Sequence, residues 1–370
     1  MDEQSLIDCD VHCTWASAAE LLQYVSQPWR RYFEQSFSPM RPVGMLFPQI
    51  GGINKRVDSF GPAGELPGSS YERLCAQHLD RFPVRAAVLT YDIGNEADLP
   101  NPFMDAEIAR AGNDWLIDRW LGLGDERLYG TVLTGTALPL EAAAEICRVG
   151  GHPRMAAVLL SANNLEQPFG HPAFDPIYAA AVEHDLPVMI HVGTEVHNAA
   201  RSNAGGLPGT RLEFHSLMSH TFEHYLTSML VYGLFEKFPD IRVGFIEGGV
   251  GWLPWLLMRL DAMEPMLRQE SPWVRRTPSD YVRDHVSFST QPLDLGPRKR
   301  GLVELFEATG GLEDLLMFAS DYPHWDADDP RHILQNLPIA WRDKVGRENA
   351  QRFFRLPRGA GLGAPSPAVG

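Results

Sequence analysis

The sequence has few of the features that mark secreted or membrane proteins. It contains only four cysteines in 370 residues, too few for the disulfide framework of a small secreted domain. The amino-terminal stretch is acidic and poor in apolar residues, so we expect no signal peptide. No uninterrupted apolar run approaches the ~20 residues that cross a bilayer. With reduced thiols expected at Cys9 and Cys13, the sequence predicts a cytoplasmic protein without a membrane partner.

Basic residues are also scarce relative to acidic ones. The chain has 32 Lys and Arg against 47 Asp and Glu, a formal net charge of -15. Such a field repels a phosphate backbone or an anionic membrane surface on average. Basic runs are short, such as those at residues 275–276 and 298–300. We therefore expect no nucleic-acid partner, and solubility is the simpler explanation of the acidity.

What the sequence does contain is a repeated pattern of short apolar segments and longer helical stretches. The eight expected strands are residues 6–11, 86–90, 128–133, 155–160, 187–191, 241–246, 285–289 and 315–319. Strand-then-helix order predicts a parallel α/β sheet. Eight such units favour a closed (β/α)8 barrel, distorted by insertions, over an open doubly wound sheet. A barrel typically needs about 250 residues, so 370 residues leave room for insertions.

Two long segments interrupt the pattern. Residues 14–84 are too long for one strand-to-helix connection, with an amphipathic start over 18–33 and a Pro/Gly-rich stretch over 37–70. We interpret them as an insertion after strand 1, acting as a lid or an oligomer contact; a passive surface loop is the alternative. Residues 192–214 form a second long loop. We expect one domain over residues 1–356 and a disordered tail over 357–370.

The first segment that carries chemistry is residues 7–13, IDCDVHC. Side chains alternate along a strand, so Asp8, Asp10 and His12 share one face. Two acids and an imidazole pointing together into a barrel are unfavourable without a partner, and a divalent metal is one such partner. Taken alone, the pattern also fits an ordinary surface acid and a hydrogen-bonded histidine.

Two further strands end in residues that bind metals. His191 ends the strand PVMIH, and Asp321 follows the apolar run MFAS. Barrel enzymes place catalytic groups at the carboxyl ends of strands. The alternatives are a core histidine bonded to a backbone carbonyl and a helix-capping aspartate. With Asp10 and His12, these residues predict a mononuclear site for zinc, manganese or iron, with zinc first, and Asp321 could also carry a proton.

Two other positions are candidates for catalysis. Glu247 ends the expected strand before Gly248 and could act as general acid/base or orient water; a buried acid paired with Arg259 is the alternative. His220 and His224 lie four residues apart on one face of an expected helix. We expect His220 to lie near the substrate and His224 to be a solvated or core histidine.

These motifs together resemble the amidohydrolase-related family typified by aminocarboxymuconate-semialdehyde decarboxylase. The resemblance spans Asp8 to about Leu356. It rests on motifs in the family's order: HPAFDPIY at 171–178, PVMIH at 187–191, FEKFPDIRV at 235–243, SDYPH at 320–324 and NA at 349–350. It implies a distorted (β/α)8 barrel, one divalent metal, a metal-bound water, an essential aspartate at Asp321 and homo-oligomerisation.

The chain departs from this family's pattern at two positions. The family's first motif is usually His-x-His, whereas Asp10 stands at its first position here. The family often has histidine before the Gly-Gly that follows strand 6, where this chain has Glu247. The extra carboxylate would neutralise more of the metal's charge, and the family's mechanism does not carry over unchanged.

The function predicted from the sequence is non-oxidative decarboxylation of a small carboxylated aromatic or unsaturated substrate. Asp321 would move the proton, Glu247 and His220 would orient water or substrate, and His324 and Trp325 would line the pocket. One alternative is hydrolysis of an amide, ester or lactone, or hydration, at the same metal. Another is a barrel without catalysis that serves as a partner protein.

Overall fold

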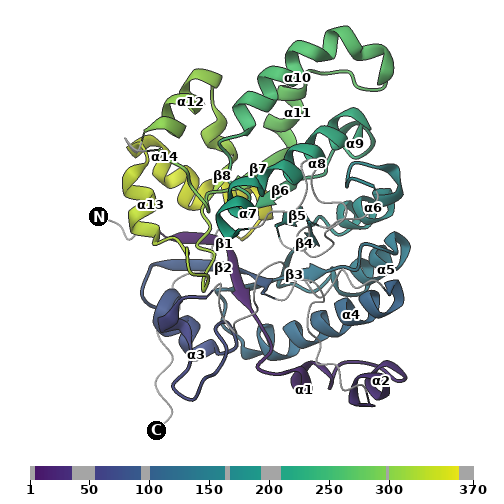
Figure 1. Ribbon diagram of the computed structural model, residues 1–370, viewed down its shortest axis with the longest axis vertical. Coiled ribbons are helices and arrows are strands. Elements are labelled where there is room, and N and C mark those ends of the chain that lie inside the picture. Colours follow the sequence, from purple (N-terminus) through teal and green to yellow (C-terminus); the bar gives the residue numbers. More distant parts are fainter. Residues whose placement is uncertain are drawn as a thin grey trace.

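The structure is a computed structural model that describes residues 5–35, 55–92, 101–162, 167–192, 210–296 and 300–357. Its centre is one eight-stranded parallel sheet whose strands follow chain order (Figure 1). The strands are β1 (Leu6–Cys13), β2 (Val84–Tyr91), β3 (Leu128–Leu133), β4 (Met155–Ser161), β5 (Val188–His191), β6 (Val243–Ile246), β7 (Val286–Ser289) and β8 (Leu316–Met317). The predicted (β/α)8 barrel is confirmed.

The barrel is closed by backbone hydrogen bonds between β1 and the chain that follows β8. The Cys9 amide donates to the Phe318 carbonyl at 3.0 Å, and the His12 amide donates to the Tyr322 carbonyl at 2.7 Å. The Asp321 amide donates back to the Asp10 carbonyl at 3.1 Å. These bonds place the two predicted acidic ligands side by side, although their positions are more than 300 residues apart.

Helices surround the strands on the outside of the barrel (Figure 1). The longer ones are α4 (Pro102–Arg119), α5 (Pro139–Val149), α6 (Asp175–Glu183), α8 (Ser219–Val231), α10 (Leu253–Leu267), α11 (Pro278–His285) and α12 (Gly301–Thr309). Several begin with proline in the first turn, where its missing amide proton has no partner to lose. The α4 helix shows a full N-terminal cap, because the Asn101 side chain accepts from the amides of Phe103 and Met104.

The shorter helices lie in the insertion after β1, in the loop after β5 and at the end of the chain. They are α1 (Ala18–Leu21), α2 (Trp29–Gln35), α3 (Tyr71–Leu74), α7 (Arg211–Leu217), α9 (Leu234–Lys237), α13 (Pro330–Asn336), α14 (Ile339–Asp343) and α15 (Asn349–Phe354). The amphipathic stretch predicted over 18–33 forms two helices, α1 and α2. Residues 36–54, 193–209 and 358–370 lie outside the described residues, so the expected Pro/Gly-rich stretch, most of the second long loop and the tail stay predictions there.

The observed strand boundaries agree closely with those predicted from the sequence, with one clear difference. The expected strand 315–319 is reduced to Leu316–Met317. The reason is that Phe318 turns away from β7: its amide donates to the Val345 carbonyl at 2.9 Å, while its carbonyl accepts from Cys9 in β1. Among the described residues, no helix is long and apolar enough to cross a membrane.

Candidate metal centre

The predicted ligands meet at the carboxyl ends of the barrel strands. His12 lies near the end of β1 and His191 ends β5, while Glu247 directly follows β6 and Asp321 follows β8. This is the end of the barrel at which enzymes of this fold place their reactive groups. We name the set Asp10, His12, His191, Glu247, Asp321 and His324 the carboxylate–histidine cluster.

One half of this cluster joins β1, β5 and β6. The Nε2 atom of His191 lies 3.3 Å from Oδ2 of Asp10 and 3.1 Å from Oε2 of Glu247. The Nε2 atom of His12 lies 3.6 Å from Oδ1 of Asp10 and 3.7 Å from Oε2 of Glu247. All four residues offer ligand atoms within 4.8 Å of one another. Two imidazoles and two carboxylates form a donor set that suits a divalent ion.

The other half joins β1 to the loop after β8. His12, Glu247, Asp321 and His324 also present ligand atoms within 4.8 Å of one another. The Nε2 atom of His12 lies 2.9 Å from Oδ1 of Asp321, and Nδ1 of His324 contacts the same oxygen. The predicted ligand set is thus divided between the halves: Asp10 and His191 lie in one and Asp321 in the other, while His12 and Glu247 belong to both.

Buried polar atoms without hydrogen bonds show that these residues fit a metal. They are Oδ2 of Asp10, both ring nitrogens of His12, Nε2 of His191 and Oδ2 of Asp321, of which His12 Nε2 and His191 Nε2 only lie against carboxylate oxygens of the same cluster. Buried polar atoms without partners are unfavourable, and functional sites are a common reason for them. Their chemistry is that of metal ligands, and they belong to two groups that share His12 and Glu247. The cluster therefore has the composition and the unsatisfied atoms that a divalent ion would complete.

Neighbouring groups fix the orientation of the ligands. The Nδ1 atom of His191 bonds to the carbonyl of Val192, which leaves Nε2 directed at the carboxylates. The Thr90 hydroxyl on β2 donates to Oδ1 of Asp10 at 2.5 Å, leaving Oδ2 for a ligand role. Such outer partners set the tautomer and direction of metal ligands. The backbone-bonded histidine considered as the alternative for His191 is therefore compatible with a ligand.

Two members of the cluster have strained backbones. Glu247 has φ of 64° and Asp321 has φ of 57°, in the left-handed region that side chains seldom adopt. The surroundings hold both: the Glu247 amide donates to the Ser289 hydroxyl at 2.8 Å, and the Asp321 amide donates to Asp10. Strain of this kind concentrates at functional sites. Glu247 pairs here with imidazoles rather than with Arg259.

The charges in the cluster strongly perturb one another. Burial disfavours the charged form of each group. For the two histidines, however, the nearby carboxylates outweigh burial, so that the pKa of His12 is raised and the pKa of His191 is raised well above its usual range. The imidazoles in turn hold the pKa of Asp10 below its usual value and that of Glu247 well below it. Burial likewise opposes charge on His324, yet the Asp321 carboxylate raises the pKa of His324 to about 10. A divalent cation would replace these protons.

Asp8 shares the predicted strand face but lies outside both halves. Its Oδ2 atom contacts Nε2 of His78 at 2.7 Å, and its Oδ1 atom accepts from the Ser320 amide at 2.9 Å. The β1–β2 register shifts between Asp8 and Val11, so the regular alternation assumed from the sequence is broken there. Asp8 joins the inserted segment to the loop after β8.

Sequence reasoning missed two charged residues beside the cluster. Lys55, within the inserted segment, pairs with Asp92, which directly follows β2. Asp92 also lies 3.3 Å from Nε2 of His324. A lysine in a Pro/Gly-rich stretch and an aspartate after a strand carry no local signal of this contact. The weak signal available was the position of Asp92 at a strand end.

The two predicted substrate residues differ in burial: His324 is buried within the cluster, whereas Trp325 lies at its exposed edge. Trp325 is 52% exposed and packs edge-on against His215 with ring centroids 5.7 Å apart. His220 is exposed on α8 and belongs to neither half of the cluster, so its role stays a prediction. A cavity of about 410 Å³ is lined by the glycine-rich residues 248–252, which directly follow Glu247 in the chain, and by His215, Met218 and Asp294 among others. Its volume suits a small molecule.

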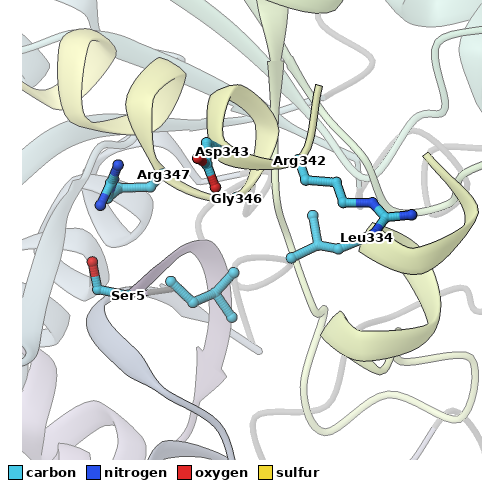
Figure 2. Close-up of a pocket in the computed structure, with 7 residues that line it drawn as sticks. Ser5, Leu334, Arg342, Asp343, Gly346 and Arg347 are labelled. Carbon is cyan, nitrogen blue, oxygen red and sulfur yellow. The ribbon is translucent and has the colours of Figure 1, made fainter. Parts of the chain in front are cut away.

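A second hollow lies at the opposite end of the barrel. It is lined by Ser5, Leu6, Leu334, Arg342, Asp343, Gly346 and Arg347 (Figure 2). Its volume is about 10 Å³, roughly enough for one water molecule. It is too small for a substrate, so the cavity at residues 248–252 is the better candidate of the two.

Comparison with known proteins agrees with this geometry. The chain matches the amidohydrolase family over residues 7–356, and no curated protein matches it. An amidohydrolase from Mycobacterium avium subsp. paratuberculosis has a similar structure, with 18% identity, a TM-score of 0.71, and coverage of 96% of this chain and 100% of that one.

Two decarboxylases also share the fold. The 5-carboxyvanillate decarboxylase of Novosphingobium aromaticivorans, complexed with manganese and 4-hydroxy-3-methoxy-5-nitrobenzoic acid, is 20% identical, with a TM-score of 0.64 over 96% of this chain and 97% of that one. The 2,6-dihydroxybenzoate decarboxylase of Rhizobium is 17% identical, with a TM-score of 0.62 over 95% and 99%. At these identities the likeness concerns the fold, whereas the family match covers nearly the whole sequence. The chain belongs to the amidohydrolase family.

Proposed function

We propose that this protein is a metal-dependent decarboxylase that releases carbon dioxide from a small carboxylated aromatic or unsaturated substrate. The observation that carries the proposal is the gathering of buried ligand atoms from Asp10, His12, His191 and Asp321, which contact one another or Glu247, in two groups that share His12 and Glu247. Family membership and the decarboxylases that share the fold supply the reaction class.

The residues proposed to hold the ion are Asp10, His12, His191 and Asp321, with Glu247 as a further candidate. Zinc is the first expectation, because imidazole and carboxylate ligands with open positions suit it. Manganese is the rival, since Glu247 adds a third carboxylate and oxygen-rich sets suit manganese. An ion held there would act as a Lewis acid on a substrate oxygen next to the leaving carboxylate.

Asp321 is proposed to carry the proton. Protonated Asp321 gives its proton to the substrate carbon that bears the carboxylate. The bond from that carbon to the carboxylate then breaks, its electron pair stays with the carbon framework, and carbon dioxide leaves. Asp321 regains a proton from solvent, so the net reaction consumes one proton and needs no oxidant. The side chain lies at the site with its Oδ2 atom free of hydrogen bonds.

The other residues would orient the substrate. Glu247 contacts His12 and His191 and directly precedes the glycine-rich residues that line the cavity, so it could hold a water molecule or a substrate hydroxyl. His324 contacts Asp321, and Trp325 with His215 forms an aromatic rim on which a flat ring could pack. His220 is kept as a substrate contact on the predicted helix face.

The test is a screen of the metal-loaded protein with carboxylated aromatic acids, including 2,6-dihydroxybenzoate and 5-carboxyvanillate. Carbon dioxide release by wild type, with a loss of about 100-fold or more in Asp321→Asn, is the expected result. Metal is counted in both proteins by elemental analysis. A matched control is Asp314→Asn, which removes an exposed ion pair with Lys344 outside the site.

The screen also separates the rival reactions. Turnover of amides, esters or lactones without carbon dioxide release would favour a hydrolase at the same site. If wild type binds metal but Asp321→Asn decarboxylates at the wild-type rate, the proposed proton carrier is wrong. If no metal binds after reconstitution, the metal-dependent reaction as a whole is refuted.

A further inference from the structure

We propose that Lys55 and Asp92 are positioning residues, which hold the His324 ring and thereby direct the Asp321 carboxylate into the site. They touch none of the proposed ligand atoms themselves and act through His324. The inference deepens the proposed function, since it assigns the inserted segment after β1 a part in the reaction at Asp321.

The contacts form one continuous chain. The Nζ atom of Lys55 contacts Oδ1 of Asp92, and the same oxygen lies 3.3 Å from Nε2 of His324. On its other side, Nδ1 of His324 contacts Oδ1 of Asp321. Both ring nitrogens of His324 thus face carboxylate oxygens, which accept hydrogen bonds and donate none when ionised. The ring is held from two sides, and its orientation is determined by Asp92 as much as by Asp321.

This arrangement gives the two carboxylate oxygens of Asp321 different contacts. Oδ1 is engaged by His324 and lies 2.9 Å from His12, whereas Oδ2 is buried and has no hydrogen bond. If the His324 ring turned, Oδ1 would lose its donor and the carboxylate could rotate. Holding the ring therefore keeps the free oxygen of Asp321 directed at the position of the proposed ion and substrate.

Because Lys55 and Asp92 are both buried, each charge depends on the other as its partner. Lys55 is 7% exposed, and its side chain and that of Asp92 are 4% and 15% exposed. A buried charge without a partner is strongly unfavourable. Burial opposes ionisation of Asp92, but Lys55 outweighs it and keeps the pKa of that carboxyl far below its usual value. Lys55 therefore maintains Asp92 as an anion that accepts from His324.

The main chain supports the same connection. Lys55 forms an antiparallel bridge with His324, and the Arg56 amide donates to the Pro323 carbonyl at 3.0 Å. These bonds fasten the inserted segment to the loop after β8, in which Asp321 holds its strained φ of 57°. The segment that carries Lys55 thus supports both the backbone and the side chain of the proposed proton carrier.

The experiment compares wild type with the double variant Lys55→Met/Asp92→Leu, which removes both charges and so avoids a lone buried ion. Lys55→Arg, with Asp92 unchanged, is the conservative variant, because it keeps the cation. Lys237→Met is the matched control, since Lys237 pairs with Asp175 at 2.6 Å on the surface. The readouts are kcat and KM for carbon dioxide release from the substrate found by the screen, metal content, thermal unfolding, and the ¹⁵N signals of the His324 ring, assigned with His324→Gln.

The double variant should keep its metal and unfold at a temperature close to wild type. Its kcat should fall by about 10–100-fold, as for loss of an outer partner, with little change in KM. The proton on Nε2 of His324 should exchange faster with solvent in the double variant. The Lys55→Arg variant should instead keep much of the wild-type kcat. A wild-type kcat, or His324 signals equal to those of wild type, would overturn the proposal. Should no substrate be decarboxylated, the proposed function fails, while the His324 signals still decide whether Lys55 and Asp92 hold the ring.

Discussion

Metal binding should stabilise the folded protein, and the size of the effect can be worked out from the cluster. Without an ion, the Glu247 carboxylate lies close to those of both Asp10 and Asp321, and four ligand atoms besides His12 Nδ1 lack hydrogen bonds. An ion that binds only the folded chain stabilises it by about 2.7 kcal/mol at 100 times its dissociation constant. We therefore expect the melting temperature to depend on metal concentration.

The expected shift is small but measurable. The entropy of unfolding is about 2.1 cal/mol/K per residue, which for 370 residues gives roughly 0.8 kcal/mol/K. Dividing about 2.7 kcal/mol by this value predicts a rise of about 3 °C at 100 times the dissociation constant. Each further tenfold increase in free metal should add about 1.4 kcal/mol to the stability, which raises the melting temperature by about 2 °C.

Differential scanning calorimetry with chelator and with increasing zinc or manganese measures this dependence. His191→Ala should abolish the shift, because His191 supplies one of the ligand nitrogens. His285→Ala is the matched control: His285 ends α11 at the other end of the barrel and bonds the Ile241 carbonyl at 2.9 Å. It should lower the melting temperature yet keep the metal dependence. A metal-induced shift of equal size in His191→Ala would refute the ligand assignment.

Three other predictions address catalysis, packing and pH. Glu247→Gln should reduce kcat/KM by about 100-fold or more, and unchanged steady-state kinetics would exclude a role for the carboxylate. Gly248→Ala should destabilise by about 1–3 kcal/mol in urea unfolding, because its Cβ would lie 2.1 Å from the Phe222 ring, whereas Gly251→Ala meets nothing within 4 Å and should be near neutral; equal effects would argue against the clash. Burial first, then nearby carboxylates, raise the pKa of Asp328 to about 7. The folded state therefore holds a proton that the unfolded state loses near pH 4, so stability should fall as pH rises from about 4 to 7, and Asp328→Asn should flatten that slope in unfolding curves at pH 5 and 8.

Much of the barrel could be predicted because its signals are local. Strand alternation and the positions of strand ends suffice to bring His12, His191 and Asp321 to one end of a barrel, since parallel strands all direct their carboxyl ends there. The same reasoning placed Asp8 on the same strand face as Asp10, although only Asp10 was predicted to be a ligand. The register shift in β1 and the contact with His78 separate them. Neither feature is local, because His78 reaches Asp8 from a π-helical turn 70 residues away.

Lys55 and Asp92 could not be predicted for a related reason. Their pairing depends on where the long segment between β1 and β2 crosses the mouth of the barrel, and hydrophobic periodicity carries no information on that path. The shortening of β8 has a similar origin: it depends on whether Phe318 bonds to β7 or to Val345, which packing between distant elements decides. The unpredicted contacts are thus those that join the insertion and the chain's last helices to the barrel end.

The charges explain why these contacts matter for a site with Asp10 and Glu247 in place of two family histidines. Asp10, Glu247 and Asp321 supply three negative charges, and a divalent ion offsets two of them. A substrate carboxylate approaching the remaining negative charge would be repelled at short range. Lys55 neutralises Asp92, which would otherwise add a fourth charge beside the cluster. His324, held between Asp92 and Asp321, can offset the remaining one when it carries a proton on both nitrogens. The Lys55–Asp92 pair therefore adds no net charge beside the cluster, and a His324 protonated on both nitrogens would make the proposed site compatible with an anionic substrate.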